Sequence, residues 1–218
     1  MNKILIALSL FFSVPVWSEG YQIKDFSYLL GKLDGINDSL LQMHFTLYQG
    51  YVKNTNAVVE ALKEIDDKTI AYGALKRRLS WEFDGMVLHE LYFENLGGKG
   101  LLSPKTALYR KIVESFGSFE KWQQNFFATG MIRGVGWVIL TQDPIDDKLY
   151  NIWVDEHNIN LLAGGNPLLI MDVWEHAYLT EYGLNRGGYI EAFYKNIDWG
   201  VVEKRLFLAP SKSRSGVK

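Results

Sequence analysis

Apolar and aromatic residues recur at three- and four-residue steps along two long stretches in the first half of the chain. Steps of that size place side chains on one face of an α-helix. The first stretch covers residues 38–62, and the second runs from about 68 to 96, where the glycine-rich segment 97–100 stops it. The pattern predicts two long helices, and the short connection between them predicts an antiparallel hairpin.

Two histidines belong to the apolar faces of these predicted helices. His44 shares its face with Tyr48 and Tyr51, and His89 is part of the apolar pattern of the second helix. Because residues three and four apart lie on the same side of a helix, both imidazoles are expected to point inward. The two histidines then face each other across the predicted hairpin.

The periodicity changes after Pro104. Two shorter helical patterns follow at 106–115 and 118–129, and Ser118 is a typical N-cap for the second. Runs rich in Val, Ile, Leu and Trp then indicate strands at 136–142, 148–155 and 167–173, with a hairpin loop at 143–147. Helical patterns return at 175–184, 188–196 and 201–206.

This order of elements predicts an α+β fold. We expect an N-terminal long α-hairpin, residues 19–100, followed by a C-terminal α/β domain, residues 101–210, that has a three-stranded antiparallel sheet and several helices. The chain has 218 residues, of which 48% are hydrophobic, enough for a sizeable core in one domain or two small ones. With 23 basic and 25 acidic residues, the body of the protein has no signature of nucleic-acid binding.

Both ends of the chain differ from the body. Lys3 followed by an apolar run at 4–14 is typical of a signal peptide, residues 1–18, and the run is too short for an integral membrane anchor. We therefore expect a periplasmic or secreted protein; a tethered N-terminus is the alternative. No cysteine is present, so no disulfide stabilises the fold. Residues 211–218 are expected to form a flexible basic tail, either a frayed end or a weak attachment to an anionic surface.

All four histidines, His44, His89, His157 and His176, lie in apolar, aromatic-rich sequence. His176 follows Asp172 by four residues, and imidazole and carboxylate are both good ligands for a transition metal. Any one of these histidines also fits a hydrogen-bonded core residue, and the aspartate fits a helix N-cap. Taken together, the four histidines indicate a buried metal.

The segment 172–178, followed by 189–193 and 196–199, closely resembles the C-terminal signature of the iron/manganese superoxide dismutases. Earlier segments that resemble the same family follow in the family's order, at 51–56, 89–93, 116–118 and 134–137. The resemblance implies one mononuclear Fe or Mn ion per chain, bound by three histidines and one aspartate. Carried over to this chain, these ligands are His44, His89, Asp172 and His176.

The resemblance also implies a reaction and a partner. Members convert the superoxide anion to O2 and hydrogen peroxide at a metal that alternates between the trivalent and divalent states. One alternative is a non-enzymatic metal-binding protein of the same fold with lost or weak dismutase activity. Another is a non-haem iron oxygenase, which uses two histidines and one carboxylate. Iron and manganese members have identical ligand sets. The ligands alone therefore do not identify the native metal as Fe, Mn or either.

Five further residues receive roles from the resemblance. Tyr51 matches the tyrosine at the substrate entrance, which belongs to the proton-delivery network. His157 falls where many manganese members have a glutamine and some iron or metal-promiscuous members have a histidine that hydrogen-bonds the metal-bound solvent, and this role is implied for it; a solvent-facing loop histidine is the alternative. Trp137 and Trp174 match the apolar wall of the site. Glu175 matches a residue that reaches the metal-bound histidine of a second subunit, and this implies a homodimer.

The first departure from the family pattern is the spacing in the first helix. Members usually have seven residues between the first ligand and the active-site tyrosine, whereas six separate His44 from Tyr51. Counting back by the usual spacing gives Met43. Methionine is a poor ligand for hard metals, so we expect that the helix absorbs a one-residue deletion, for example by regularising a π-bulge. The alternative is that Tyr51 is displaced from its usual role.

Other departures affect the entrance. Leu179 stands where the family has a tyrosine that pairs with a gateway histidine, and that histidine is missing as well. Tyr48 or Gln49 is a candidate replacement for it. Ile139 replaces an aromatic residue two positions after Trp137. All four expected ligands remain in place.

Overall fold

The computed structural model describes residues 20–208. The signal peptide and the basic tail expected at 1–18 and 211–218 lie outside these residues. A 3-10 turn at Ser27–Leu29 precedes the first long helix. Within the described range, no helix combines the length and the apolar character needed to cross a bilayer.

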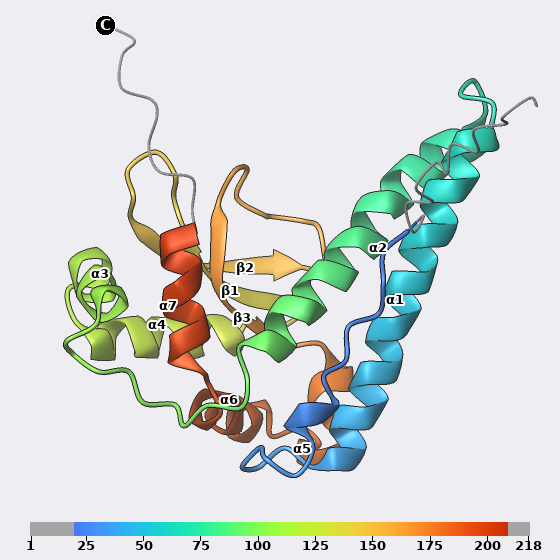
Figure 1. The fold of residues 1–218 in the computed structure, drawn as a ribbon. Helices are drawn as coiled ribbons and strands as arrows, with labels where there is room; N and C mark the ends of the chain where they lie inside the picture. Colours follow the sequence, from blue (N-terminus) through green and yellow to red (C-terminus); the bar gives the residue numbers. More distant parts are fainter. Residues whose placement is uncertain (1–19, 209–218) are drawn as a thin grey trace, which may run out of the picture.

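Two long helices, α1 (Asp38–Glu64) and α2 (Ile70–Glu94), pack side by side as the expected hairpin, whose tip lies far from the sheet (Figure 1). The side chain of Asn37 accepts a hydrogen bond from the Leu40 N–H at the start of α1, and Thr69 does the same for Tyr72 at the start of α2. Such caps satisfy N–H groups that have no partner inside the helix. The helical periodicity and the capping residues together account for this part of the fold.

The second half begins with α3 (Ala107–Phe116) and α4 (Phe119–Gly130), which are followed by a three-stranded antiparallel sheet. Its strands are β1 (Gly136–Gln142), β2 (Leu149–Asp155) and β3 (Asn166–Asp172), in the order β2-β1-β3. The central strand β1 is buried along its whole length, which explains its continuous apolar sequence. The predicted α+β fold is confirmed.

The chain then forms a 3-10 turn, η2 (Glu175–Ala177), and the helices α5 (Leu179–Tyr182), α6 (Arg186–Lys195) and α7 (Trp199–Leu208). The single helix expected at 175–184 was wrong, because Tyr178, with φ −148°, separates η2 from α5. Asp172 Oδ1 accepts a hydrogen bond from the Trp174 N–H and so tightens the turn that leaves β3. This turn brings His176 back toward Asp172.

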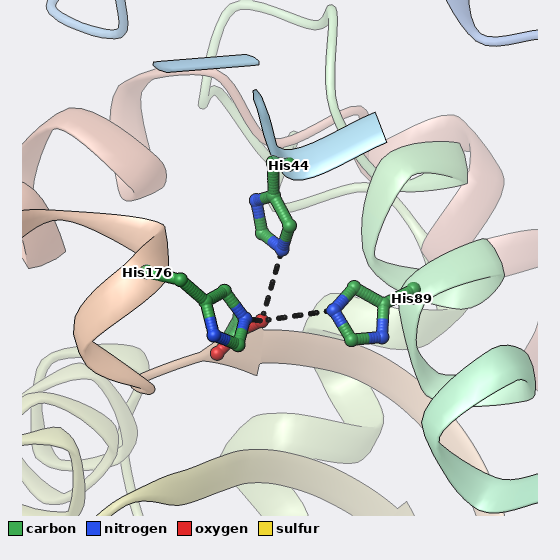
Figure 2. A group of neighbouring side chains, drawn as sticks. His44, His89 and His176 are labelled. Atoms are coloured by element: carbon green, nitrogen blue, oxygen red, sulfur yellow. Dashed lines mark hydrogen bonds and ion pairs between the residues drawn. The ribbon is translucent and has the colours of Figure 1, made fainter. Parts of the chain in front are cut away.

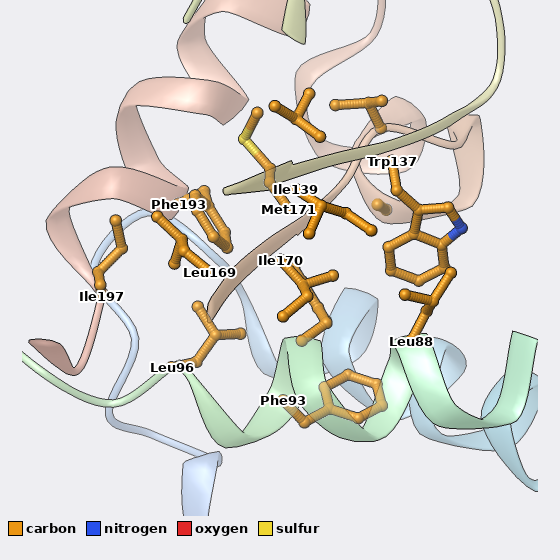
Figure 3. Close-up of a cluster of buried hydrophobic side chains, with 14 of the residues drawn as sticks. Leu88, Phe93, Leu96, Trp137, Ile139, Leu169, Ile170, Met171, Phe193 and Ile197 are labelled. Atoms are coloured by element: carbon orange, nitrogen blue, oxygen red, sulfur yellow. The ribbon is translucent and has the colours of Figure 1, made fainter. Parts of the chain in front are cut away.

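The core lies where α2 and α6 pack against the sheet (Figure 3). Its side chains are buried, and burying a large apolar one typically stabilises the fold by about 1.5–3 kcal/mol. Ten of them come from the two halves of the chain: Leu88, Phe93, Leu96, Trp137, Ile139, Leu169, Ile170, Met171, Phe193 and Ile197. This contact fixes α2, which carries His89, relative to β3, which carries Asp172.

Asp84 lies on α2 in an apolar pocket of about 200 Å³ between this helix and the sheet. Burial raises the pKa of its carboxyl to about 6. The unfolded chain releases this proton near pH 3.8, so ionisation between about pH 4 and 6 favours unfolding. Asp84→Asn is expected to raise the unfolding free energy at pH 7, by less than about 1 kcal/mol after solvent screening, and to give no gain at pH 4.

Urea unfolding of both proteins at the two pH values measures this effect. The exposed Asp67 supplies the control, since Asp67→Asn is expected to leave stability unchanged at pH 7. An equal gain from Asp84→Asn at pH 4 and pH 7 would contradict the assignment of the effect to ionisation.

Candidate metal centre

Four side chains from four elements meet at one point. His44 comes from α1, His89 from α2, Asp172 from the end of β3 and His176 from η2, and one ligand atom of each lies within 4.8 Å of all the others. The three imidazole rings converge in Figure 2. His44, His89 and Asp172 are buried, whereas His176 is partly exposed. Every ligand expected from the sequence is therefore brought into one cluster.

The Asp172 carboxylate is the centre of this cluster. Its Oδ2 atom lies 3.1 Å from Nε2 of His44, 3.1 Å from Nε2 of His176 and 3.6 Å from Nε2 of His89. Burial on its own would raise the pKa of Asp172, but electrostatic interaction and hydrogen bonds with His176 and His44 hold that pKa far below its usual range. The carboxylate is therefore ionised in any ordinary buffer, as metal binding requires.

The tautomer of His89 shows what the cluster is suited to bind. Its Nδ1 atom lies 2.5 Å from the carbonyl oxygen of Gly85, which only accepts, so Nδ1 carries the proton. Nε2 therefore presents a lone pair toward the Asp172 carboxylate, and it is buried without a hydrogen-bond partner among the described residues. Two such lone pairs repel each other unless a cation lies between them.

Burial lowers the pKa of His44 and lowers the pKa of His89 well below its usual value, where the nearby His44 adds to the effect. Both rings are therefore neutral, which is the form that binds metals. Three imidazoles and one carboxylate form a donor set that fits Fe or Mn. An oxygenase site with two histidines and one carboxylate would leave the third imidazole without a role.

The structure shows which residue of α1, Met43 or His44, faces Asp172. The helix runs from Asp38 to Glu64 as an uninterrupted α-helix, and His44 reaches Asp172 from it. The side chain of Met43 is on the other side, 49% exposed. The helix has no bulge between His44 and Tyr51.

His157 lies in a hydrogen-bonded chain beside the cluster. The Trp137 indole N–H donates to its Nδ1 atom at 3.0 Å, and its Nε2 atom lies 2.7 Å from the Tyr51 hydroxyl oxygen. Burial lowers the pKa of His157 to about 4, so the ring is neutral and carries a single proton. Since an indole N–H only donates, that proton is on Nε2 and is donated to Tyr51. The Tyr51 hydroxyl proton thus remains free for another acceptor.

The wall of the site is aromatic. Trp137 packs edge-on against His89 with ring centroids 4.9 Å apart, and Trp174 stacks on His157 at 4.8 Å. Trp81, which the sequence analysis missed, packs against His157 at 4.7 Å and against Tyr51 at 5.5 Å. The four-residue steps from Trp81 to Gly85 to His89 place it on the ligand face of α2 and could have identified it.

The residues considered for the entrance, Tyr48, Gln49 and Leu179, lie outside the cluster of four expected ligands. Tyr48 donates to Glu90 at 2.9 Å and accepts from the backbone N–H of Lys24 at 3.0 Å. Its hydroxyl is thus bound to α2 and the N-terminal segment. Gln49 lines a pocket of about 310 Å³ beside the same segment. Leu179 is 41% exposed and lies with Glu175 in a different surface hollow, of about 440 Å³.

Gly85 allows Tyr51 to approach α2. A Cβ atom at position 85 would lie 2.7 Å from Cδ1 of the Tyr51 ring, well inside van der Waals contact. Gly85→Ala is expected to displace the ring and to weaken the 2.7 Å contact between Tyr51 and His157. We expect kcat to fall about tenfold while the metal content is unchanged.

Gly73→Ala on the same helix is the control, since its Cβ would meet only Arg77, at an ordinary 3.8 Å. This control is expected to keep full activity and to gain a little stability from helix propensity. Unchanged kcat in Gly85→Ala would show that the position of the Tyr51 ring does not limit the rate.

Comparison with known proteins identifies relatives of both halves. Residues 20–97 match the family description "Iron/manganese superoxide dismutases, alpha-hairpin domain", and residues 104–205 match its C-terminal domain. An iron superoxide dismutase of Cupriavidus metallidurans is 39% identical over 185 residues, 82% of this chain and 92% of that protein. An iron superoxide dismutase of Pyrobaculum aerophilum is 33% identical over 198 residues, 88% of this chain and 94% of that protein. A manganese superoxide dismutase of Haloferax volcanii is 38% identical over 168 residues, 75% and 83% of the two chains.

Proposed function

This chain belongs to the iron/manganese superoxide dismutase family, and on that premise we propose that His44, His89, Asp172 and His176 bind its catalytic metal ion. The protein is a superoxide dismutase, which converts superoxide to O2 and hydrogen peroxide at a mononuclear Fe or Mn site. The observation that supports the ligand assignment most directly is the buried lone pair of His89 Nε2, 3.6 Å from Asp172 Oδ2.

The bound ion supplies one-electron redox chemistry, by alternating between the trivalent and divalent states. The chain's own residues prepare the site for it. The ionised Asp172 would offset one positive charge of the ion, and imidazoles, which bind metals in their neutral form, would add none. His157 holds the Tyr51 oxygen through its one N–H, so that the Tyr51 hydroxyl can donate its proton toward a substrate anion. Trp137 and Trp174 limit the access of water to these groups.

The function is tested with the purified protein loaded separately with Fe and with Mn. We expect one ion per chain and catalytic dismutation with at least one of the two metals, measured by pulse radiolysis or stopped flow. Metal bound at one per chain with no activity above that of the free ion would support the non-enzymatic alternative. Elemental analysis of protein from its native compartment identifies the metal used there.

We also propose that the enzyme is periplasmic or secreted. The support is the sequence of residues 1–18, with Lys3 ahead of an apolar run too short to span a bilayer. Cell fractionation and the mass of the mature protein test this proposal. A mass equal to that of the full 218-residue chain in the cytosol would contradict it.

A homodimer is the third part of the proposal. Glu175 is exposed one residue before the expected ligand His176, in a surface hollow that also includes Tyr178, Leu179 and Arg186. A carboxylate in this place is suited to accept a hydrogen bond from a histidine of a second copy. Light scattering coupled to size exclusion is expected to give twice the chain mass, and a monomer at micromolar concentration would contradict the proposal.

A further inference from the structure

The residue immediately before His157 is bound at three points. The Glu156 N–H donates to the carbonyl oxygen of Val135 at 3.2 Å, and its own carbonyl oxygen accepts from the Trp174 indole at 3.2 Å. Its carboxylate accepts from the Trp81 indole N–H at 2.8 Å. Three contacts therefore fix the position of Glu156: one with the residue before β1, one with the segment that carries His176, and one with α2.

The backbone of Glu156 is strained. Its φ is +51°, in the left-handed region. Among the described residues, Asp147 and Asn160 are the other non-glycine residues with positive φ, and Asp and Asn tolerate this region because their short side chains bond locally. The side chain of glutamate is longer and does not tolerate this region in the same way. Strained residues of this kind persist where the surrounding contacts hold them, and they are frequent at functional sites.

Helix α2 holds the loop on both sides of His157. Trp81 binds Glu156, and the neighbouring Ser80 accepts a hydrogen bond from the Asn158 side chain at 2.7 Å. Trp81 also contacts the rings of both His157 and Tyr51. The loop between β2 and β3 is thus tied to the hairpin at the residue before and the residue after His157.

The direction of the His157 ring matters because it has one proton to donate. A primary amide at this place would have two N–H donors, whereas the neutral imidazole has only the one on Nε2. A small rotation of the His157 ring breaks its contact with the Tyr51 oxygen, and the Tyr51 hydroxyl can then turn its own proton away from the substrate anion. We propose that Trp81 and Glu156 are positioning residues that aim the His157 N–H at Tyr51; this rests on the proposed function.

The test uses the metal-loaded enzyme and two readouts, kcat and the dissociation constant of azide, a substrate-sized anion followed by visible absorption. Trp81→Phe removes the indole N–H and retains an aromatic ring. Glu156→Gly removes the carboxylate and also relieves the positive φ, so loss of folding does not confuse the result. We expect each variant to lower kcat about fivefold and to weaken azide binding about threefold, because the anion loses the Tyr51 donor.

The double variant is expected to be no worse than either single variant, since both remove the same contact. Glu156→Gln retains an acceptor for the Trp81 indole and is expected to recover most of the loss. Trp153→Phe is the matched control: its indole also donates to a carboxylate, that of Asp155 at 2.6 Å, on the β2 strand away from the His157 and Tyr51 rings. Both readouts are expected to be unchanged in this control.

Additive losses in the double variant, or unchanged kcat and azide affinity in both single variants, would overturn the positioning role. So would a loss of activity that follows a loss of metal. A wild-type enzyme that binds one ion and azide but does not dismute superoxide overturns the function itself, and the azide readout still tests the positioning of Tyr51 in that case.

Discussion

Replacing His89 by glutamine is expected to remove both the metal and the activity. His89 is completely buried, and its Nε2 lone pair has no partner in the described part of the chain. The amide nitrogen of glutamine only donates, so the variant has no nitrogen lone pair to present at this place. We expect the metal content to fall from one ion per chain to below about a tenth, and dismutation to fall at least about 10³-fold.

His157→Gln is the matched control, because His157 lies beside the cluster without belonging to it. It is expected to retain one ion per chain, although its kcat changes. Metal content is measured by elemental analysis, and folding by circular dichroism. If His89→Gln kept both a full complement of metal and full activity, His89 would not be a ligand and the proposed site would be wrong.

Arg205→Met is expected to lower the free energy of unfolding by about 3 kcal/mol. The guanidinium of Arg205, on α7, belongs to a residue that is only 8% exposed. It donates to the carbonyl oxygens of Leu168 and Leu91, each at 2.9 Å, and to Glu94 at 3.2 Å. Methionine fills a similar volume but donates nothing, so the Leu168 carbonyl loses this donor, and the Leu91 carbonyl and Glu94 retain only the Asn95 N–H and Lys24. The contact between α7, β3 and the end of α2 is weakened as a result.

Urea unfolding of the metal-loaded enzyme measures this loss, and Arg110→Met is its control. Arg110 is an exposed arginine whose side chain donates to the carbonyl of Lys105, at 2.8 Å. Its substitution is expected to change stability by less than about 0.5 kcal/mol. A loss of similar size in both variants would mean that the general loss of a positive charge, and not the buried hydrogen bonds, determines the effect.

The part of the fold that local chemistry controls could be predicted from the sequence. The long helices were expected because their apolar spacing repeats over many turns, and Ser118 was expected as an N-cap because a hydroxyl satisfies free N–H groups. The helix expected at 175–184 was wrong, since Tyr178, with φ −148°, separates η2 from α5. The Tyr178 hydroxyl accepts hydrogen bonds from the Arg186 side chain on α6, and local propensity does not include a contact of this kind.

The sequence alone determined the types of ligand, the order of the helices and strands, and the resemblance to one family of enzymes. Only the tertiary structure decided that His44 and not Met43 faces Asp172, which is 128 positions away from His44. It also decided that the His157 proton is on Nε2, and that Trp81 binds Glu156 across the two halves of the chain. The physical reason is that periodicity and capping act within a few residues, whereas these contacts arise only when the packed core brings distant segments together.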